Sequence, residues 1–561
     1  MTSKISFFLL FFGYISFSGL FAQSLHLTAI GQNEGETNIL KTLDYQQQFN
    51  DFNSLEQETR IIAKNISILG YIESELTVLN KVNDSSFVAV FHLGQQYTKA
   101  IIHYDASLDK NLLKIISNTI TENYFEIEVP KLEIALKTLN SEISNAGDPF
   151  SSLQLTNIKK EKGILYVDLK IEKNRPRTID AILVKGYEKF PTSFIKRYLK
   201  IKRKQTFNLK AIKQKTRTLE NLQFASQIKD PEVLFAKDST LLYLYLEKQK
   251  SNTFDGFIGF ATNTETSKIE FDGYLNLNLI NNLNYGESFR LLYKSDESSQ
   301  KTFDVKTRLP YLFGSPIGVQ LGLNIFKKDS SFVTTSQFAK LDFQINPSNG
   351  IALGIDALTS TNLLDNTITS IQDLKSTFFN INYNHLEQQS HDPLFPVNFM
   401  FDISAGTGKR SMENSSQSQS KFHLNTFKIF NLNHRNSIYG NVSAAVLNSD
   451  NFVENELFRF GGINSIRGFE ENSLTANLFG VFNTEYRYKV TNSLYVNSIF
   501  DVAYYENQIL DIKSKLLGFG FGFGILTQAG LLKLNYSNGS VENQAIKLSN
   551  SKMHISLTAR F

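Results

Sequence analysis

From residue 251 onward, apolar and polar residues alternate along stretches that are separated by runs of Asn, Asp, Gly and Ser. Ile317, Val319 and Leu321 fall on one face of such a stretch, with Gln320 on the other. This period of two predicts β-strands with one apolar and one polar face. We expect sixteen strands, beginning near residues 254, 268, 288, 302, 317, 337, 351, 376, 398, 421, 437, 479, 493, 515, 531 and 552.

Two architectures fit this pattern. In a soluble sandwich the apolar faces turn inward, whereas in a wide barrel they turn toward lipid and the polar faces line a wet lumen. Periodicity alone does not separate them. The even number of strands, the end of the chain on the last strand and an N-terminal export signal favour the barrel. We therefore predict an all-β, 16-stranded antiparallel transmembrane barrel over residues 251–561.

The export signal occupies residues 1–22. One charge, Lys4, precedes an apolar run that ends in Ala22, which predicts a secretory signal peptide cut before Gln23. An uncleaved membrane anchor is the alternative. No later stretch reaches the ~18 apolar residues that a spanning helix needs.

Residues 23–250 differ, because helical and strand patterns alternate there. The order β-α-α-β-β occurs three times, which predicts three similar α+β units at 23–95, 96–175 and 176–250. In the first unit we expect Ser54 to cap a helix, since Gln57 completes a capping box. Gly70 and Gly147 stand where helices should end.

Composition narrows the chemistry. The chain has no Cys, which excludes disulfides, thiolate metal sites and a Cys nucleophile. Its 58 Lys+Arg nearly balance 54 Asp+Glu, so we expect no binding of nucleic acid. The charge is unevenly distributed, with the densest basic run at residues 196–204. That run could face anionic lipid headgroups or an acidic partner, or form a solvated helix face.

One long connection, residues 448–478, separates the eleventh and twelfth predicted strands. It contains Ile466, Arg467, Gly468 and Phe469 shortly after a Gly-Gly pair. This loop motif, its position before the last five strands and the three preceding units resemble the BamA/TamA superfamily of outer-membrane proteins. In that comparison the units are POTRA-like domains. Three of them with a 16-stranded barrel come closest to the TamA pattern, since BamA typically has five and two-partner secretion transporters have two.

The resemblance implies that the motif loop folds into the lumen and that its Arg meets acidic groups on the next two strands. Glu485 and Asp501 are the matching carboxylates in this chain. An unpaired buried charge costs several kcal/mol, so we expect Arg467 to pair with Asp501 or Glu485. A solvated loop Arg is the alternative. Ala503 stands where the family's Phe-x-Asp-x-Gly strand motif usually has Gly.

Two further features suit a barrel. Gly518, Gly520, Gly522 and Gly524 alternate with Phe residues, and this bare face either makes room for the motif loop or belongs to an ordinary barrel strand. The C-terminal Phe561 matches the aromatic residue by which the assembly machinery reads bacterial outer-membrane barrels. Interfacial anchoring is the alternative for Phe561.

The resemblance implies an assembly factor that inserts or translocates β-barrel or exported proteins. The POTRA-like units, in the periplasm, would receive unfolded outer-membrane or exported protein substrates. A lateral gate would lie between strands 254–262 and 551–561 of a barrel in the cell outer membrane of a Gram-negative bacterium. Partners would include outer-membrane lipid and periplasmic or membrane accessory proteins. A dedicated two-partner-type secretion pore and a passive outer-membrane channel are the alternatives.

We expect no enzyme, no catalytic residues, no cofactor and no metal. A barrel hydrolase would need a Ser-His-Asp or acidic constellation, and the sequence shows none. The stretch at 405–411 resembles a phosphate loop, but Ile403 occupies a required Gly position. We interpret that stretch as a loop after a strand. His385 and His391 are expected to be lumen or loop residues.

Overall fold

The computed structural model describes residues 24–106, 108–262, 269–295, 300–364, 370–389, 392–413, 415–547 and 551–561. The predicted signal peptide, residues 1–22, and His391 lie outside these ranges. Within them, no helix has the length and apolar character to cross a membrane. The chain forms two compact units, one ending at Thr178 with Thr206–Leu209 added, the other comprising Ile179–Gln205 and Lys210–Phe561.

The first compact unit begins with a four-stranded sheet in the order β2-β1-β4-β3, whose first and last long strands, β1 and β4, are parallel. Its core contains Leu27, Leu55 and Phe91, all fully buried. Its elements are β1 (Leu25–Gly31), α2 (Glu34–Leu40), β2 (Gln48–Phe49), α3 (Phe52–Ile68), β3 (Glu75–Lys81) and β4 (Ser86–His92).

The expected cap of α3 was wrong by three residues. Asp51 is the N-cap, and its carboxylate accepts a hydrogen bond of 2.8 Å from the backbone N–H of Ser54. Ser54 therefore lies in the first turn of the helix, because an aspartate with extended backbone already satisfies the free amide. The predicted end is confirmed, since Gly70 follows the helix with a φ of 101°.

A second sheet follows in the same compact unit, in the order β6-β7-β5-β9-β8, again with its first and last long strands, β5 and β9, parallel. Gly147 ends its long helix with a φ of 113°, as predicted. Its elements are β5 (Lys99–His103), α4 (Lys110–Leu113), β6 (Thr119–Ile120), β7 (Tyr124–Glu128), η1 (Val129–Lys131), α5 (Leu132–Asn145), β8 (Ser152–Glu161) and β9 (Ile164–Glu172).

The third sheet, in the order β10-β12-β11, is followed directly by the barrel. Here too the first and last strands, β10 and β12, pair in parallel. Its elements are β10 (Ala181–Lys185), α6 (Thr192–Arg197), α7 (Leu209–Arg217), η2 (Thr218–Asn221), β11 (Ala225–Phe235) and β12 (Thr240–Lys248).

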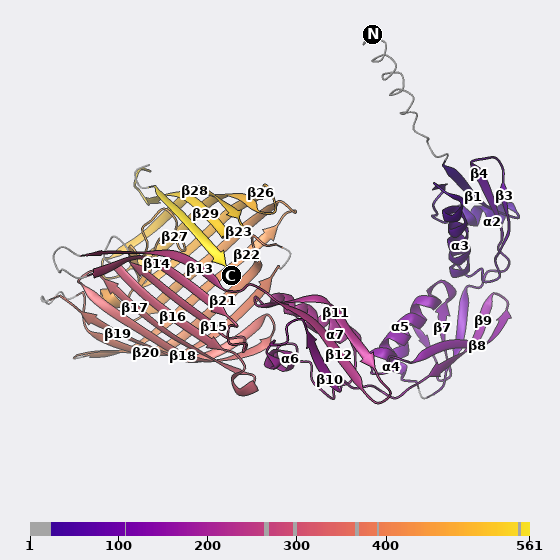
Figure 1. Ribbon diagram of the computed structural model, residues 1–561, viewed down its shortest axis with the longest axis horizontal. Coiled ribbons are helices and arrows are strands. Elements are labelled where there is room, and N and C mark those ends of the chain that lie inside the picture. Colours follow the sequence, from indigo (N-terminus) through magenta and orange to yellow (C-terminus); the bar gives the residue numbers. More distant parts are fainter. Residues whose placement is uncertain are drawn as a thin grey trace, which may run out of the picture. The chain divides into compact units, whose positions relative to one another are not determined.

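The rest of the chain forms a closed barrel of sixteen strands, which run obliquely side by side in Figure 1. Every adjacent pair is antiparallel, so the predicted fold class is confirmed. The strands are β13 (Thr253–Thr262), β14 (Ile269–Ile280), β15 (Ser288–Ser295), β16 (Gln300–Leu309), β17 (Ile317–Lys328), β18 (Phe332–Asn346), β19 (Asn349–Asn362), β20 (Leu374–Gln388), β21 (Val397–Met412), β22 (Ser415–Asn431), β23 (Asn436–Asn448), β26 (Leu478–Lys489), β27 (Leu494–Asn507), β28 (Ile512–Leu526), β29 (Gly530–Val541) and β30 (Lys552–Arg560).

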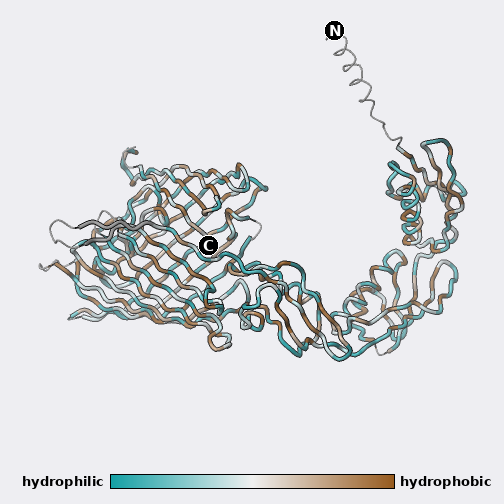
Figure 2. Tube along the Cα trace, in the orientation of Figure 1, coloured by the Kyte–Doolittle hydropathy of each residue, from teal (hydrophilic) through white to brown (hydrophobic). Residues whose placement is uncertain are grey.

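The apolar faces of these strands turn outward, which excludes the sandwich. Leu353 and Phe379 are 62% and 64% exposed on the outer wall, whereas Asn380 is buried on the inner side. Hydrophobic and hydrophilic positions alternate along the barrel strands in Figure 2. A band of exposed apolar side chains on a closed barrel is the surface that a lipid bilayer covers.

The chain enters the barrel at Thr253. Because the strands alternate in direction, the turns that follow the even-numbered strands, such as β14, β16 and β18, lie at that same end of the barrel. We call this end the domain-side rim. The connection 448–478 joins β23 to β26 at the other end. It contains η4 (Glu454–Glu456) and a small hairpin of β24 (Phe458–Phe460) and β25 (Leu474–Ala476).

The glycine-containing stretch at 405–411 is part of β21, so its interpretation as a loop was wrong. Gly406 and Gly408 lie opposite Asn380 and Phe378 of β20. A Cβ at Gly408 would approach the Phe378 Cα to 2.8 Å. These glycines therefore accommodate large neighbours within the wall rather than bend the chain.

Candidate functional site

The connection 448–478 packs its central part against the inner wall of the barrel. Phe460 stacks on Phe479 of β26, with ring centroids 4.7 Å apart and planes 6° from parallel. Ile466, the first residue of the predicted motif, is fully buried. It shares an apolar cluster with Val481 and Ala503, which come from β26 and β27. We call the segment 448–478 the lumen loop.

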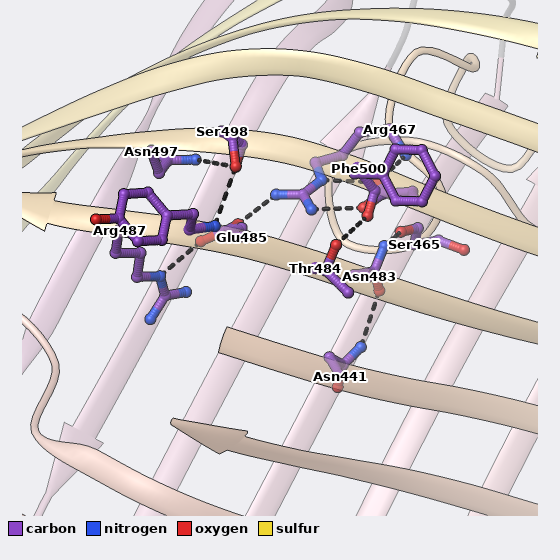
Figure 3. Close-up of polar contacts among 12 residues, drawn as sticks. Asn441, Ser465, Arg467, Asn483, Thr484, Glu485, Arg487, Asn497, Ser498 and Phe500 are labelled. Atoms are coloured by element: carbon purple, nitrogen blue, oxygen red, sulfur yellow. Dashed lines mark hydrogen bonds and ion pairs between the residues drawn. The ribbon is translucent and has the colours of Figure 1, made fainter. Parts of the chain in front are cut away.

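Arg467 is brought together with both predicted carboxylates. Figure 3 shows its contact with Glu485. Its Nε donates to Asp501 Oδ2 at 2.8 Å, and its Nη2 donates to Asp501 Oδ1 at 2.6 Å. Its Nη1 donates to Glu485. Asp501 also accepts from the backbone N–H of Arg467 at 3.0 Å and is fully buried.

Glu485 does not serve Arg467 alone. Its Oε2 accepts from Arg487 Nε at 2.6 Å, and Arg487 lies over the rings of Phe395 and Tyr439 at 4.4 and 4.1 Å. Two guanidinium groups thus face two carboxylates, so the buried charges balance locally. Such a network tolerates burial only while every member is present, because removal of one leaves an uncompensated charge.

Two glycines allow the loop backbone to lie directly on the wall. Gly468 has a φ of 92°, and a Cβ there would lie 2.7 Å from the Asn538 carbonyl oxygen. A Cβ at Gly518 would overlap the carbonyl oxygen of Arg467. The close approach therefore requires hydrogen in place of a side chain at both positions.

The other members of the glycine row do not face the lumen loop. A Cβ at Gly520 would meet the backbone of β29, one at Gly522 would meet Asn535, and one at Gly524 would meet the ring of Tyr495. The expectation that the whole bare face receives the loop thus holds at Gly518 only. Phe469, the last motif residue, lies beside Gly539, where a Cβ would come within 2.8 Å of its ring.

A second buried ion pair holds the first half of the lumen loop, and sequence reasoning missed it. Arg410 of β21 is fully buried and pairs with Glu456 of η4. Its Nη2 also donates to Asn451 Oδ1 at 2.7 Å. Arg410 belongs to the inward, polar set of its strand, and Glu456 belongs to an acidic cluster in the loop. Those two signals could have suggested the pair.

Further polar contacts bind the same half of the loop to other strands. Lys328 Nζ of β17 lies 2.9 Å from Glu454 Oε1, and Asn455 Nδ2 donates to Ser360 Oγ of β19 at 2.8 Å. The lumen loop is therefore anchored on two separate arcs of the wall, β17–β22 and β26–β29. A cavity of about 600 Å³ beside it is lined by charged residues, among them Lys306, Asp356, Lys421, Glu456 and Arg459.

The seam between the first and last strands is short. β13 pairs with β14 along its whole length, from Thr253 to Thr262. With β30, by contrast, the pairing in the described residues comprises Thr253↔Arg560 and Phe254↔Ala559. The predicted C-terminal residue, Phe561, is about half exposed, and its N–H donates to Asn252 O at 3.1 Å.

No His, Asp and Glu residues gather in threes at metal-binding distance within the described ranges. His385 lies in β20, where its Nδ1 is 2.8 Å from Asn349 Oδ1.

Comparison with known proteins finds a partial family match and a shared fold. Residues 346–523 match the family of haemolysin secretion/activation proteins ShlB/FhaC/HecB. A search of curated proteins finds no match. BamA from Haemophilus ducreyi lacking POTRA domains 1–3 superposes with a TM-score of 0.50 at 14% identity, covering 82% of this chain and 99% of that one.

Two CdiB structures superpose over more of the chain. CdiB from Acinetobacter baumannii gives a TM-score of 0.52 at 14% identity, with 91% of this chain and 98% of that chain covered. CdiB from Escherichia coli gives 0.53 at 13% identity, with coverages of 90% and 97%.

The closed barrel, the lumen loop with its anchored Arg and the preceding α/β domains give this chain the fold of the BamA and CdiB structures. The predicted resemblance to the BamA/TamA superfamily is confirmed at the level of the fold. The family match to ShlB/FhaC/HecB covers residues 346–523, which is less than half of the chain.

Proposed function

We propose that this protein inserts or translocates polypeptides in the outer membrane of a Gram-negative bacterium, with its POTRA-like domains in the periplasm. The observation that carries the proposal is the short seam between β13 and β30. On this reading residues 1–22 direct export and are removed. The C-terminal Phe561 helps the barrel itself to be assembled.

A strand edge without a partner is a template for another strand. Residues 255–262 of β13 and 552–558 of β30 have no register partners across the seam in the described structure. Incoming strands would add to these edges by main-chain hydrogen bonds. Burial of the new apolar face in lipid supplies the driving force. The proposal needs no chemical step, and so no catalytic residue or cofactor.

Reception of substrate falls to the sheet edges of the α/β domains. β3 is an edge strand, and its Leu76 and Val78 are exposed. An extended segment with apolar side chains, from an unfolded substrate or an accessory protein, could extend this sheet. Substrate would then be held in an extended form.

A dedicated secretion pore is the second candidate. The match to haemolysin secretion proteins and the two CdiB folds favour it. Export through the lumen would require the lumen loop to leave its two anchors. Depletion of this protein from cells distinguishes the assembly factor from the secretion pore. Loss of many outer-membrane proteins supports assembly, whereas loss of one exported partner supports the pore.

A disulfide across the seam tests lateral opening. Phe254 and Ala559 are direct register partners, and the chain has no Cys of its own, so Phe254→Cys with Ala559→Cys creates a unique pair. Leu532→Cys with Leu557→Cys, between β29 and β30, is the matched control. We expect loss of function only for the oxidised seam pair, with recovery on reduction. Full function with the seam completely cross-linked would exclude a lateral gate.

A further inference from the structure

The third α/β domain is fastened to the domain-side rim of the barrel. Helix α6 places Phe194 with its ring centroid 5.0 Å from that of Tyr311, in the turn after β16. Tyr187 accepts a hydrogen bond of 2.7 Å from Asn281, in the turn after β14. Gly286 lies in the same turn after β14, and a Cβ there would overlap the Phe194 ring. The turn after β14 therefore also contacts α6. α6 thus lies between two rim turns.

This part of the domain carries an unbalanced positive charge. Residues 192–205 and 210–217 contain ten Lys and Arg and no Asp or Glu. Burial lowers the pKa of Lys215, and the charges of Lys200 and Lys202 lower it further. Asp230 offsets the charge of Lys213, since its Oδ2 lies 2.8 Å from Lys213 Nζ. Lys200, Lys202 and Lys215 lie close enough to repel one another, and an anion from outside the chain would relieve that repulsion.

Two of these cations contact the barrel directly, which shows where the basic residues lie along the barrel. Arg197 Nε donates to Gly314 O at 2.8 Å, and Lys200 Nζ donates to Ile345 O at 3.0 Å. Both acceptors are backbone carbonyls at the domain-side rim, Gly314 in the turn after β16 and Ile345 near the end of β18. Arg197 and Lys200 therefore contact the rim as well as solvent, and Lys196, Lys200 and Lys202 are all exposed.

The same rim turns present large apolar side chains outward. Phe313 is 98% exposed at the tip of the turn after β16. Leu283 and Tyr285, in the turn after β14, are each 67% exposed. In the described structure no other residue covers these three side chains substantially, although water is a poor environment for them.

The backbone at Phe313 is strained. Tyr311 and Phe313 have φ angles of 54° and 51°, a region that bulky residues rarely occupy. The contacts of Arg197 and Phe194 hold this turn in place. Strain that keeps an aromatic ring fully exposed indicates a role for the ring outside the protein itself.

The exposed rim residues continue the lipid-facing wall. Leu309 and Ile317, which flank the turn on β16 and β17, are both exposed on the outer side. Aromatic residues at the end of a lipid-facing band lie at the level of the lipid headgroups in membrane barrels. The basic patch is therefore adjacent to the level at which headgroup phosphates occur.

We propose that Lys196, Arg197, Lys200 and Lys202, together with Leu283, Tyr285 and Phe313, form a surface that binds anionic phospholipid. The cations would contact headgroups of the inner leaflet, and Phe313 would insert among the acyl chains. We call these seven residues the basic rim surface. The inference rests on the membrane placement under the proposed function, and it adds a lipid class and a site.

The absence of Trp from the chain permits a direct test. Phe313→Trp places a single indole at the site in the full-length protein, reconstituted in nanodiscs. Phosphatidylglycerol and phosphatidylcholine, each brominated on the acyl chains, serve as quenchers at equal mole fraction. We expect quenching to be about twofold or more stronger with the anionic lipid, because basic clusters enrich it locally. Tyr285→Trp provides a second reporter should Phe313→Trp not fold.

Two single-Trp controls separate the inference from the membrane placement. Phe379→Trp, on the outer wall, should be quenched equally by both lipids. Val82→Trp, exposed in the turn after β3, is the reference for an indole in water. Quenching at 379 without quenching at 313 would overturn the inference alone, and would favour an acidic protein partner. An absence of quenching at 379 would overturn the membrane placement too.

Charge reversal tests the cations. Lys196→Glu with Lys202→Glu, combined with Phe313→Trp, should reduce the preference for anionic lipid to none. Lys41→Glu with Lys64→Glu, two exposed positions in the first compact unit, is the matched control and should keep the preference. Equal quenching by the two lipids before any charge reversal, or an unchanged preference after reversal at 196 and 202, would overturn the proposal.

Discussion

Asp501 holds Arg467 by three hydrogen bonds, one from the backbone N–H and two from the guanidinium. The carboxylate therefore fixes both the charge and the path of the chain at residue 467. The guanidinium of Arg presents two parallel N–H donors to the two oxygens of a carboxylate, whereas the single ammonium of Lys does not. The pair positions the tip of the lumen loop as well as neutralising a buried cation.

Arg467→Lys should consequently behave as a damaging change although it keeps the charge. The Lys side chain is shorter and its ammonium would make a single contact with Asp501. We therefore expect the loop tip to leave the wall more often. Asp501→Asn should be worse, because it leaves a buried guanidinium short of negative charge at a cost of ~3–5 kcal/mol. Complementation of a depleted strain measures function, and the mobility of unheated samples in electrophoresis measures barrel folding.

The expected result is a loss of function that exceeds the loss of folded barrel. Lys489→Arg, in β26 but away from the motif, controls for a change of cation type in the wall. Normal complementation by Arg467→Lys and Arg467→Ala would mean that the motif Arg has no special role.

Gly468→Ala tests the close contact between the lumen loop and β29. The new Cβ would lie 2.7 Å from the Asn538 carbonyl oxygen, in a backbone with positive φ. Gly94→Ala is the matched control, since Gly94 also has positive φ but its nearest atom would be 3.5 Å away. We expect Gly94→Ala to show only the backbone penalty of ~1 kcal/mol. Gly468→Ala should in addition release the loop tip, detected as faster hydrogen exchange at residues 464–470.

Gly518→Ala tests the same contact from the wall. The methyl group would overlap the Arg467 carbonyl oxygen, so the loop should be displaced and function should fall. At Gly480, on β26 of the same wall, a Cβ would meet nothing within 4 Å, so Gly480→Ala should be neutral. Equal effects of the two variants in complementation would indicate general strand damage rather than loss of room for the loop.

The barrel was predictable because one physical rule governs all of its strands. Each wall strand has lipid on one side and a polar lumen on the other, so alternation appears in the sequence sixteen times. Strand ends were harder to predict. β22 begins at Ser415 rather than near 421, since its first residues are polar on both faces and give no periodic signal.

The site was predictable only in part. Arg467, Glu485 and Asp501 could be assigned through a short motif and strand alternation. Arg410 and Glu456 are 46 residues apart, and no local pattern links them. Likewise, Asp51 and Ser54 are both good caps, and only the extended backbone at Asp51 decides between them. Contacts set by tertiary packing leave no periodic trace in the sequence.

The second anchor leads to a prediction about the independence of the two halves of the lumen loop. Glu456→Ala leaves the fully buried Arg410 without its carboxylate, so the first half should open more readily, by ~3 kcal/mol. Arg467→Ala should open the second half instead. Because the chain lacks Cys, Val453→Cys and Ile466→Cys, both at buried positions, report on each half through the rate of maleimide labelling.

We expect Glu456→Ala to speed labelling at 453 by about tenfold or more and to leave 466 nearly unchanged, because sites without shared partners act independently. Glu413→Ala, near the end of β21 and outside the ion pair, is the control and should change neither rate. If Glu456→Ala exposes both positions equally, the lumen loop moves as one body. Release at either anchor would then clear the lumen, which would favour the secretion pore over an assembly factor with a fixed loop.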